Sequence, residues 1–342
     1  MFEQTMLIKD TQNAVGLKRL FLFWFGPVAA IRLSAFRAAM AMAVFFYLLN
    51  RWADKEEWLS EAGFHVSAQN LPYHQLSVPL LPTEFLPWFG VILFGSLIAV
   101  ICGWRLNWTI WVAWGCLFYV TMADQLSSFV INKLSVVALL TVALGSVRGM
   151  EGRPRRFDSL CECKTNQRGR PRISQQRLQS AWPVRILQIT LIASYFTAGF
   201  SKIIGGEWLK DPYVLWSQLQ GTYRTDFAAW LLRMLPLGTW PVIQYAALAF
   251  EILAPFHFGI KRLRGVGLVW GLGFQLMIAA TMHQLIYFSL VMLSFYVLFI
   301  DEKALYKAQH FFLKNGFKKN HQPFDSLHSL RVDTECHRSS KG

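Results

Sequence analysis

The sequence predicts an all-α integral membrane protein, a multi-pass bundle of about eight transmembrane helices with both termini on the cytoplasmic side. Apolar residues make up 54% of the chain and charged residues only 16%, whereas ordinary soluble domains carry about 25% charged residues. Apolar runs of about 17 to 25 residues, the length that crosses ~30 Å of hydrocarbon, recur along the chain. Lys and Arg concentrate in alternate connections, as they do in cytoplasmic loops.

Each apolar run is predicted as a helix because only a helix satisfies its own backbone hydrogen bonds within hydrocarbon. The expected spans are 33–50, 85–102, 106–122, 128–147, 184–201, 240–259, 265–282 and 284–300. Short connections join the second span to the third, the third to the fourth and the seventh to the eighth. These pairs should therefore pack as antiparallel hairpins.

The distribution of basic residues sets the orientation of the bundle. The connections 1–32, 103–107, 148–185, 260–264 and 301–342 hold 4, 1, 10, 3 and 8 of the 34 Lys and Arg residues. The remaining connections are poor in basic residues and include the acidic stretch "ADKEEWLSE". One topology satisfies every loop: both termini are cytoplasmic, and residues 51–84 and 203–239 lie outside.

This topology divides the chain into three parts. We expect a cytoplasmic N-terminal segment (1–32), a transmembrane domain (33–301) that contains a basic cytoplasmic loop (148–183), and a polar, disordered cytoplasmic tail (302–342). Within the outer connection, the apolar positions of "FAAWLLRMLP" fit a short helix at the membrane interface. A bacterial cytoplasmic membrane is the expected location, with membrane lipid as a partner.

Charge and cysteine usage argue against several other classes of protein. The net charge of +14 and the "RGRPR" stretch at 168–172 are explained by a cytoplasmic loop, so no nucleic-acid partner is expected. The five cysteines form neither a disulfide framework nor a zinc spacing, so no metal is predicted. The N-terminus lacks the pattern of a removable signal peptide.

Ionisable groups within spans are costly, and each is therefore a candidate site residue. Lys202 closes the fifth span in "YFTAGFSKIIGGEW", where apolar surroundings disfavour the ammonium form and make a lysine usable as a base. The alternative is a snorkelling lysine that anchors the span. Glu251, near the middle of the sixth span, either is neutral and hydrogen-bonded, or it pairs with a cation or receives a proton.

Other polar residues are weaker candidates. Each of them has a structural alternative: a snorkelling side chain, a turn residue or an ordinary interfacial residue. They are Arg37, Asp124, Gln125, Asn132, Lys133, His257, Gln275 and His283.

Four stretches resemble the horizontally transferred transmembrane (HTTM) domain family, which is related to vitamin K-dependent γ-carboxylase. They are "FRAAMAMAVFFYLLNRWADKEEWLSEAGFHV" (36–66), "YFTAGFSKIIGGEWLKDPYVLW" (195–216), "ALAFEILAPF" (247–256) and "YFSLVMLSFYVLF" (287–299). Their order and spacing carry the resemblance over roughly residues 30–300.

The resemblance implies a quinone site on the outer side of the bundle. In the carboxylase, the lysine of this motif deprotonates vitamin K hydroquinone, and Lys202 matches that lysine. The implied ligand is vitamin K hydroquinone or another quinone. Residues Asn132, Lys133, Trp208, Glu251, Gln275 and His283 would line the cavity, and Gly205 and Gly206 would form the bend that folds Trp208 over its mouth.

The departures from the carboxylase leave the activity open. The chain ends in about forty polar residues instead of a large lumenal substrate-binding portion, and Asn132 and Gln275 stand near places where catalytic histidines are expected. A glutamine does not shuttle protons as histidine does. A non-enzymatic maturation or scaffold role, as in toxin maturation, is the alternative, with a small thiol-disulfide oxidoreductase or a peptide substrate as partner. A transporter is a weaker third hypothesis, because no inverted repeat is evident.

Overall fold

The computed structural model describes residues 18–63, 78–123, 130–148 and 178–318 of the chain. Asp124, Gln125 and most of the basic loop lie outside these ranges. The described residues belong to two compact units that divide between Ile300 and Asp301, close to the predicted start of the tail. The first unit holds all of the predicted spans.

The prediction of an all-helical membrane domain is confirmed in its main features, because every expected span is built from helices. The long helices are α2 (Ile31–Arg51), α4 (Leu86–Cys102), α5 (Leu106–Ala123), α6 (Val130–Arg148), α7 (Trp182–Gly205), α11 (Trp240–Ile252), α13 (Arg264–Thr281) and α14 (Ile286–Tyr296). Within the described ranges, four helical segments are long and apolar enough to cross a membrane, or five if one bent pair is counted. The four segments are Ile31–Leu59, Thr83–Cys102, Leu106–Ala123 and Trp182–Gly205.

The surface of the long helices supports their placement in lipid. Val91 on α4 and Val269 on α13 are 66% and 75% exposed, a pattern that a soluble protein would bury. Trp88, in the first turn of α4, and Trp104, just after its end, are also exposed. At 1.5 Å per residue they are separated by about 24 Å along the helix, which suits aromatic anchors at the two interfaces of a bilayer.

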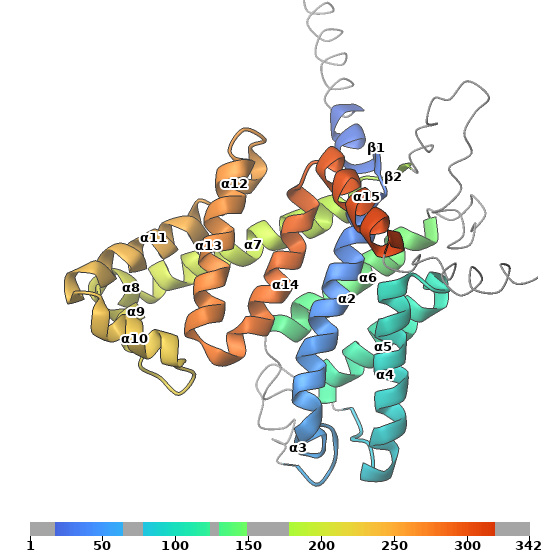
Figure 1. Ribbon diagram of the computed structural model, residues 1–342, viewed down its shortest axis with the longest axis horizontal. Coiled ribbons are helices and arrows are strands. Elements are labelled where there is room, and N and C mark those ends of the chain that lie inside the picture. Colours follow the sequence, from blue (N-terminus) through green and yellow to red (C-terminus); the bar gives the residue numbers. More distant parts are fainter. Residues whose placement is uncertain (1–17, 64–77, 124–129, 149–177, 319–342) are drawn as a thin grey trace, which may run out of the picture. The chain divides into compact units, whose positions relative to one another are not determined.

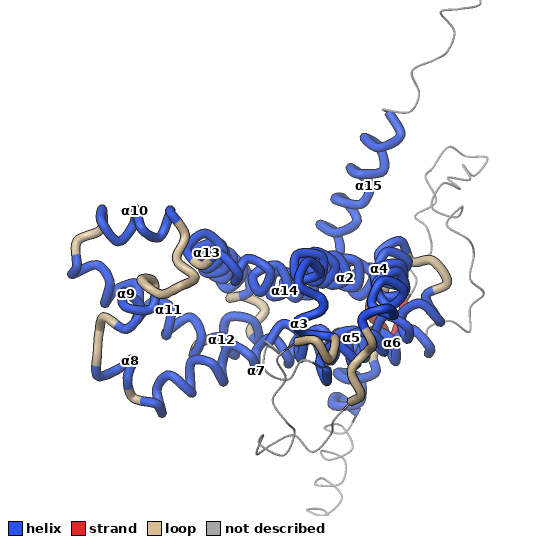
Figure 2. Tube along the Cα trace, turned by 90° about the horizontal axis from the view of Figure 1, so that it is seen from below, coloured by secondary structure: helices blue, strands red, loops and turns tan. Residues whose placement is uncertain are grey.

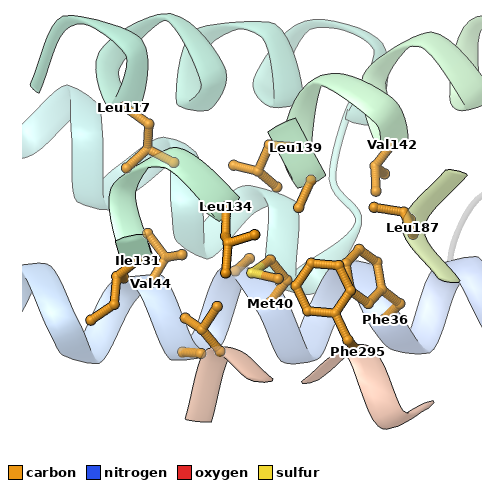
Figure 3. Close-up of a cluster of buried hydrophobic side chains, with 14 of the residues drawn as sticks. Phe36, Met40, Val44, Leu117, Ile131, Leu134, Leu139, Val142, Leu187 and Phe295 are labelled. Carbon is orange, nitrogen blue, oxygen red and sulfur yellow. The ribbon is translucent and has the colours of Figure 1, made fainter. Parts of the chain in front are cut away.

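Within the first unit, α2 lies beside both α4 and α14, and α7 lies beside both α6 and α11 (Figures 1 and 2). Helices α2, α4, α5 and α6 form one group, and α7 and α14 connect it to α11 and α13. The two expected hairpins α4–α5 and α5–α6 are packed pairs, as is α13–α14. Figure 3 shows the core between these groups, in which Phe36 and Met40 of α2 meet Leu134, Leu187 and Phe295 from other helices.

Short elements occupy the two connections that the sequence predicts to lie outside. The first contains η1 (Trp52–Asp54), α3 (Lys55–Leu59) and η3 (Thr83–Phe85); the second contains α8 (Glu207–Lys210), α9 (Val214–Gln218), α10 (Asp226–Met234) and η5 (Leu237–Thr239). Helix α10 is the short helix predicted from "FAAWLLRMLP". Thr225 caps it by accepting a hydrogen bond from the Ala228 N–H at 3.1 Å, which satisfies a backbone group that a helix start leaves open.

Three features differ from the sequence-based expectations. A two-stranded antiparallel ribbon, β1 (Pro27–Ala29) paired with β2 (Leu178–Ser180), accompanies the helices. The expected span 240–259 is broken at Leu253 and continues as α12 (Ala254–Gly259), because Pro255 has no N–H to continue the ladder. The predicted disordered tail begins with helix α15 (Glu302–Lys318), whose Glu, Lys, Ala and Leu residues favour a helix.

Candidate functional site

Helix α7 presents two different faces. Phe196, Phe200 and Ile204 follow one another at intervals of four and are all exposed, so they lie on one face of the helix. Tyr195, Gly199 and Lys202 lie on another face at intervals of four and three. The second face packs against α11. The helix therefore directs Lys202 toward its neighbour in the bundle.

Lys202 forms a close ion pair with Glu251. The Nζ atom donates to Oε1 at 2.6 Å and to Oε2 at 2.7 Å, and the two side chains are 26% and 6% exposed. Charges that lose water are tolerated when they are paired and hydrogen-bonded in this way. Of the two readings that the sequence left open for Glu251, the structure has the one in which the carboxylate pairs with a cation.

A glycine allows the two helices to approach at this point. A Cβ atom at Gly199 would lie 2.9 Å from Glu251 Cβ and 3.1 Å from Ile252 Cδ1, closer than carbon atoms pack in proteins. Glycine therefore permits the contact between α7 and α11 that places Glu251 beside Lys202. The same device recurs on α13, where Gly267 meets His257 and Gly271 meets Tyr296.

Trp208, in the connection between α7 and α11, lies over the Lys202 ammonium. Gly206 ends α7 with a φ of 74°, a left-handed conformation that favours glycine, and α8 begins at the next residue. Trp208 is 7% exposed, and the Lys202 ammonium lies 4.3 Å from the centroid of its ring. A cation at this distance from an indole face is attracted by the ring electrons. The predicted bend before Trp208 is present, with Gly206 as its left-handed residue.

Gln244 holds the segment that carries Trp208, and sequence reasoning missed it. Its Nε2 atom donates to the backbone oxygens of Trp208 at 2.9 Å and Asp211 at 2.8 Å. Its Oε1 atom accepts from the Leu215 N–H at 2.9 Å. The signal in the sequence is its spacing: Gln244 precedes Glu251 by seven residues, which places both on one face of α11.

A second buried polar group lies deeper in the bundle. Gln275 Nε2 donates to the Tyr195 hydroxyl at 2.6 Å, and the hydroxyls of Tyr195 and Tyr296 are 2.7 Å apart. Gln275 is fully buried, and its Oε1 atom has no hydrogen-bond partner among the described residues. Tyr195 lies two turns below Lys202 on the same face of α7. The sequence singled out Gln275 but neither tyrosine.

The other predicted site residues are not joined to Lys202 by any contact among the described residues. Asn132 on α6 is 2% exposed, and its Nδ2 atom has no partner in the described ranges. Its neighbour Lys133 is exposed. His283 is exposed in η6 (His283–Leu285), where its backbone N–H donates to the Tyr223 oxygen at 2.9 Å, consistent with the turn role.

Two weaker candidates have structural surroundings. The Arg37 guanidinium lies near Gly103, at the turn between α4 and α5. His257 is buried on α12, with its ring 5.2 Å from that of Trp270. Both positions agree with the structural alternatives given above.

An open pocket of about 450 Å³ lies in the connection between α7 and α11. Its lining residues are Glu207, Lys210, Asp211, Val214, Ser217 and Gln218. Trp208, which contacts Lys202, lies on α8 between Glu207 and Lys210. Both of these residues line the pocket. Lys202 and Glu251 themselves do not line it.

A comparison with protein families identifies the domain. A family model described as the HTTM domain matches residues 25–303. Searches of curated proteins and of solved structures each found no match to the chain. The matched range starts at the end of the helix before β1 and covers α7, α11 and the Lys202–Glu251 pair. The chain belongs to the HTTM domain family.

Proposed function

We propose that the protein binds a quinone-like, lipid-soluble molecule at an outward-facing site, with Lys202 as a base, as in the related vitamin K-dependent carboxylase. The observation that carries this proposal is the pairing of Lys202 with Glu251 beneath the ring of Trp208. A charged pair at the end of a membrane helix, covered by an indole, combines a proton acceptor with an aromatic surface.

The residues present fit a hydroquinone. A ligand of this class needs a few polar groups for its oxygens and apolar surroundings for its ring and tail. Lys202 and Glu251 offer the polar groups, and the Trp208 ring offers a face for stacking. When bound, a hydroquinone supplies an acidic O–H and two electrons for oxidation.

Lys202 accepts a proton only after it has lost its own. Transfer of that proton to Glu251 across the 2.6 Å contact leaves an amine and a carboxylic acid, both neutral. Neutral groups cost less to keep out of water than ions. We therefore assign Glu251 as the acceptor of the Lys202 proton and Lys202 as the group that then takes the proton of the ligand hydroxyl.

Activity measurements test the role of Lys202. Lys202→Ala and Lys202→Arg should abolish oxidation or epoxidation of vitamin K hydroquinone by dioxygen, assayed with the full-length protein in mild detergent. Lys261→Ala, at an exposed lysine between α12 and α13, is the matched control and should keep full turnover. Membrane insertion of each variant is verified first. Unchanged turnover in Lys202→Ala would refute the role as a base.

A non-enzymatic maturation or scaffold role is the second candidate. It is favoured by the closed geometry of the pair, in which both Glu251 oxygens already contact Lys202. On this hypothesis, Lys202→Ala impairs assembly or the retention of a partner, such as a peptide or a thiol-disulfide oxidoreductase, and quinone turnover is absent from the start. Identification of a small molecule that co-purifies in mild detergent separates the two, since a quinone supports the first.

We also propose that the first unit crosses the membrane eight times, with both termini in the cytoplasm of a bacterial cell. The crossings are α2, α4, α5, α6, α7, the broken pair α11–α12, α13 and α14. The distribution of Lys and Arg supports this orientation. Cysteines placed singly at Lys55 and Arg262 should react with an impermeant reagent from opposite sides of the membrane. Labelling of both from one side would refute the topology.

A further inference from the structure

The outer connection contains a segment that we call the roof segment, residues 207–218, which spans α8 and α9. Trp208 belongs to it and lies over the Lys202 ammonium. Its backbone is bound by a single side chain of α11, because Gln244 makes hydrogen bonds to Trp208, Asp211 and Leu215. The roof segment is therefore held at three points along its length by one amide.

Gln244 is suited to this task by its chemistry and burial. The side chain is 0% exposed, so its polar atoms depend on these three bonds for satisfaction. The amide nitrogen supplies two donors and the amide oxygen an acceptor. A carboxylate keeps the acceptor but loses both donors, and an aliphatic side chain loses all three bonds.

The same helix carries the other half of the site. Gln244 and Glu251 are seven residues apart, which is two turns of α11 on one face. Helix α11 thus holds Lys202 through Glu251 and holds the indole above Lys202 through Gln244. Because both side chains project from one helix, the spacing of Gln244 and Glu251 along α11 sets the distance between the Trp208 ring and the Lys202 ammonium.

We propose that Gln244 is a positioning residue of this site: it holds the Trp208 ring over Lys202 and thereby limits the access of molecules from the outer side to the lysine. The inference rests on the proposed function only in treating Lys202 as the reactive group. Release of the amide frees the backbone of the roof segment, and the indole no longer covers the ammonium.

The rate at which a water-soluble amine reagent modifies Lys202 tests the proposal. Full-length protein in mild detergent is treated with the reagent, and the modified peptides are followed by mass spectrometry. Gln244→Leu should raise the Lys202 rate by at least about tenfold, because each lost hydrogen bond is worth about fivefold in an equilibrium constant. Gln244→Glu should raise it as well, since it removes the two donors.

A matched control separates positioning from general loosening. Gln188 is another buried amide, 5% exposed, and its Nε2 atom donates to the Leu298 oxygen at 2.9 Å. Its Oε1 atom accepts from Arg185 Nη1 at 3.1 Å, so Gln188→Leu removes two hydrogen bonds of α7 without touching the roof segment. It should leave the Lys202 rate within about twofold of wild type. An equal rise in this control would overturn the proposal, as would an unchanged rate in Gln244→Leu.

Variants that lack the Trp208 indole test whether Gln244 limits the modification of Lys202 through this ring. Trp208→Ala alone should raise the Lys202 rate, and adding Gln244→Leu to it should change the rate by less than about twofold. A full additional rise in the double variant would show that Gln244 acts by another route. None of these rates depends on turnover. If Lys202→Ala leaves quinone oxidation unchanged, the proposed function fails while the positioning role of Gln244 is judged separately.

Discussion

The Lys202–Glu251 pair allows a quantitative prediction by a double-mutant cycle. Lys202→Met and Glu251→Leu each remove one partner, and the double variant replaces the pair with apolar side chains. Removing one partner of a buried pair costs about 3–5 kcal/mol because the other charge is left without compensation. Replacing both by apolar groups is close to neutral. The cycle isolates the coupling between the two residues.

The exposure of each side chain sets the expected size of each effect. Lys202 is 26% exposed and Glu251 only 6%, so a solitary lysine reaches water more easily than a solitary carboxylate. We expect Glu251→Leu to cost about 2–3 kcal/mol and Lys202→Met about 3–4 kcal/mol near neutral pH. With the double variant close to neutral, the coupling is then about 5–7 kcal/mol. Exposed pairs in contrast contribute about 0.2–1 kcal/mol.

Reversible unfolding in sodium dodecyl sulfate measures these free energies for full-length protein in mixed micelles. Lys210→Met, at an exposed lysine of α8, is the matched control and should lie within about 0.5 kcal/mol of wild type. A coupling below about 1 kcal/mol would refute the argument, because it would mean that the pair behaves as if it were in water. A larger cost for Glu251→Leu than for Lys202→Met would refute the reasoning from exposure.

Three further predictions follow from packing and hydrogen bonding. Gly199→Ala should lower the free energy of unfolding relative to Gly273→Ala by about 1–3 kcal/mol, the usual cost of overpacking, because only the first added methyl group meets a neighbour within 4 Å; equal stabilities would contradict the close approach of α7 and α11. Tyr195→Phe should cost about 1–3 kcal/mol in the same assay, since it leaves Gln275 Nε2 without its acceptor; no loss would show that the amide finds another partner. Thr225→Ala should cost about 0.5–2 kcal/mol by removing the cap of α10, and faster hydrogen exchange confined to α10 is the expected signature; unchanged exchange would exclude a role for the cap.

The helical membrane domain could be predicted from the sequence because each span is indicated by many apolar residues together and not by any single residue. A long apolar run has few alternatives to a helix in hydrocarbon, and the positions of the runs agree with the observed helices within a few residues. The break at Leu253 was missed although Pro255 is visible, since membrane helices often tolerate proline. The β1–β2 ribbon was missed because three-residue strands have no periodicity to detect.

The candidate site was only partly predictable for a related reason. Lys202, Trp208 and Glu251 were each singled out, but nothing local indicates that Glu251, 49 residues further on, is the partner of Lys202. Gln244 attracted no attention because an uncharged amide in a span is common, and its value lies in three backbone partners that only the fold supplies. Lys133 and His283 show the converse, as polar residues that were expected at the site and that the fold leaves exposed.

The β1–β2 ribbon has a consequence for the order of assembly during synthesis. The ribbon pairs Pro27 of β1 with Ser180 of β2. Strand β1, just before α2, is therefore synthesised about 150 residues before its partner strand. At about 5–20 residues per second, this delay lasts roughly 8 to 30 s. Helix α2 must therefore remain in the membrane while β1 lacks its partner strand and before α14 is made. During this time α4, α5 and α6 are inserted beside it. The N-terminal helices must hold together on their own before the helix that carries Lys202 arrives.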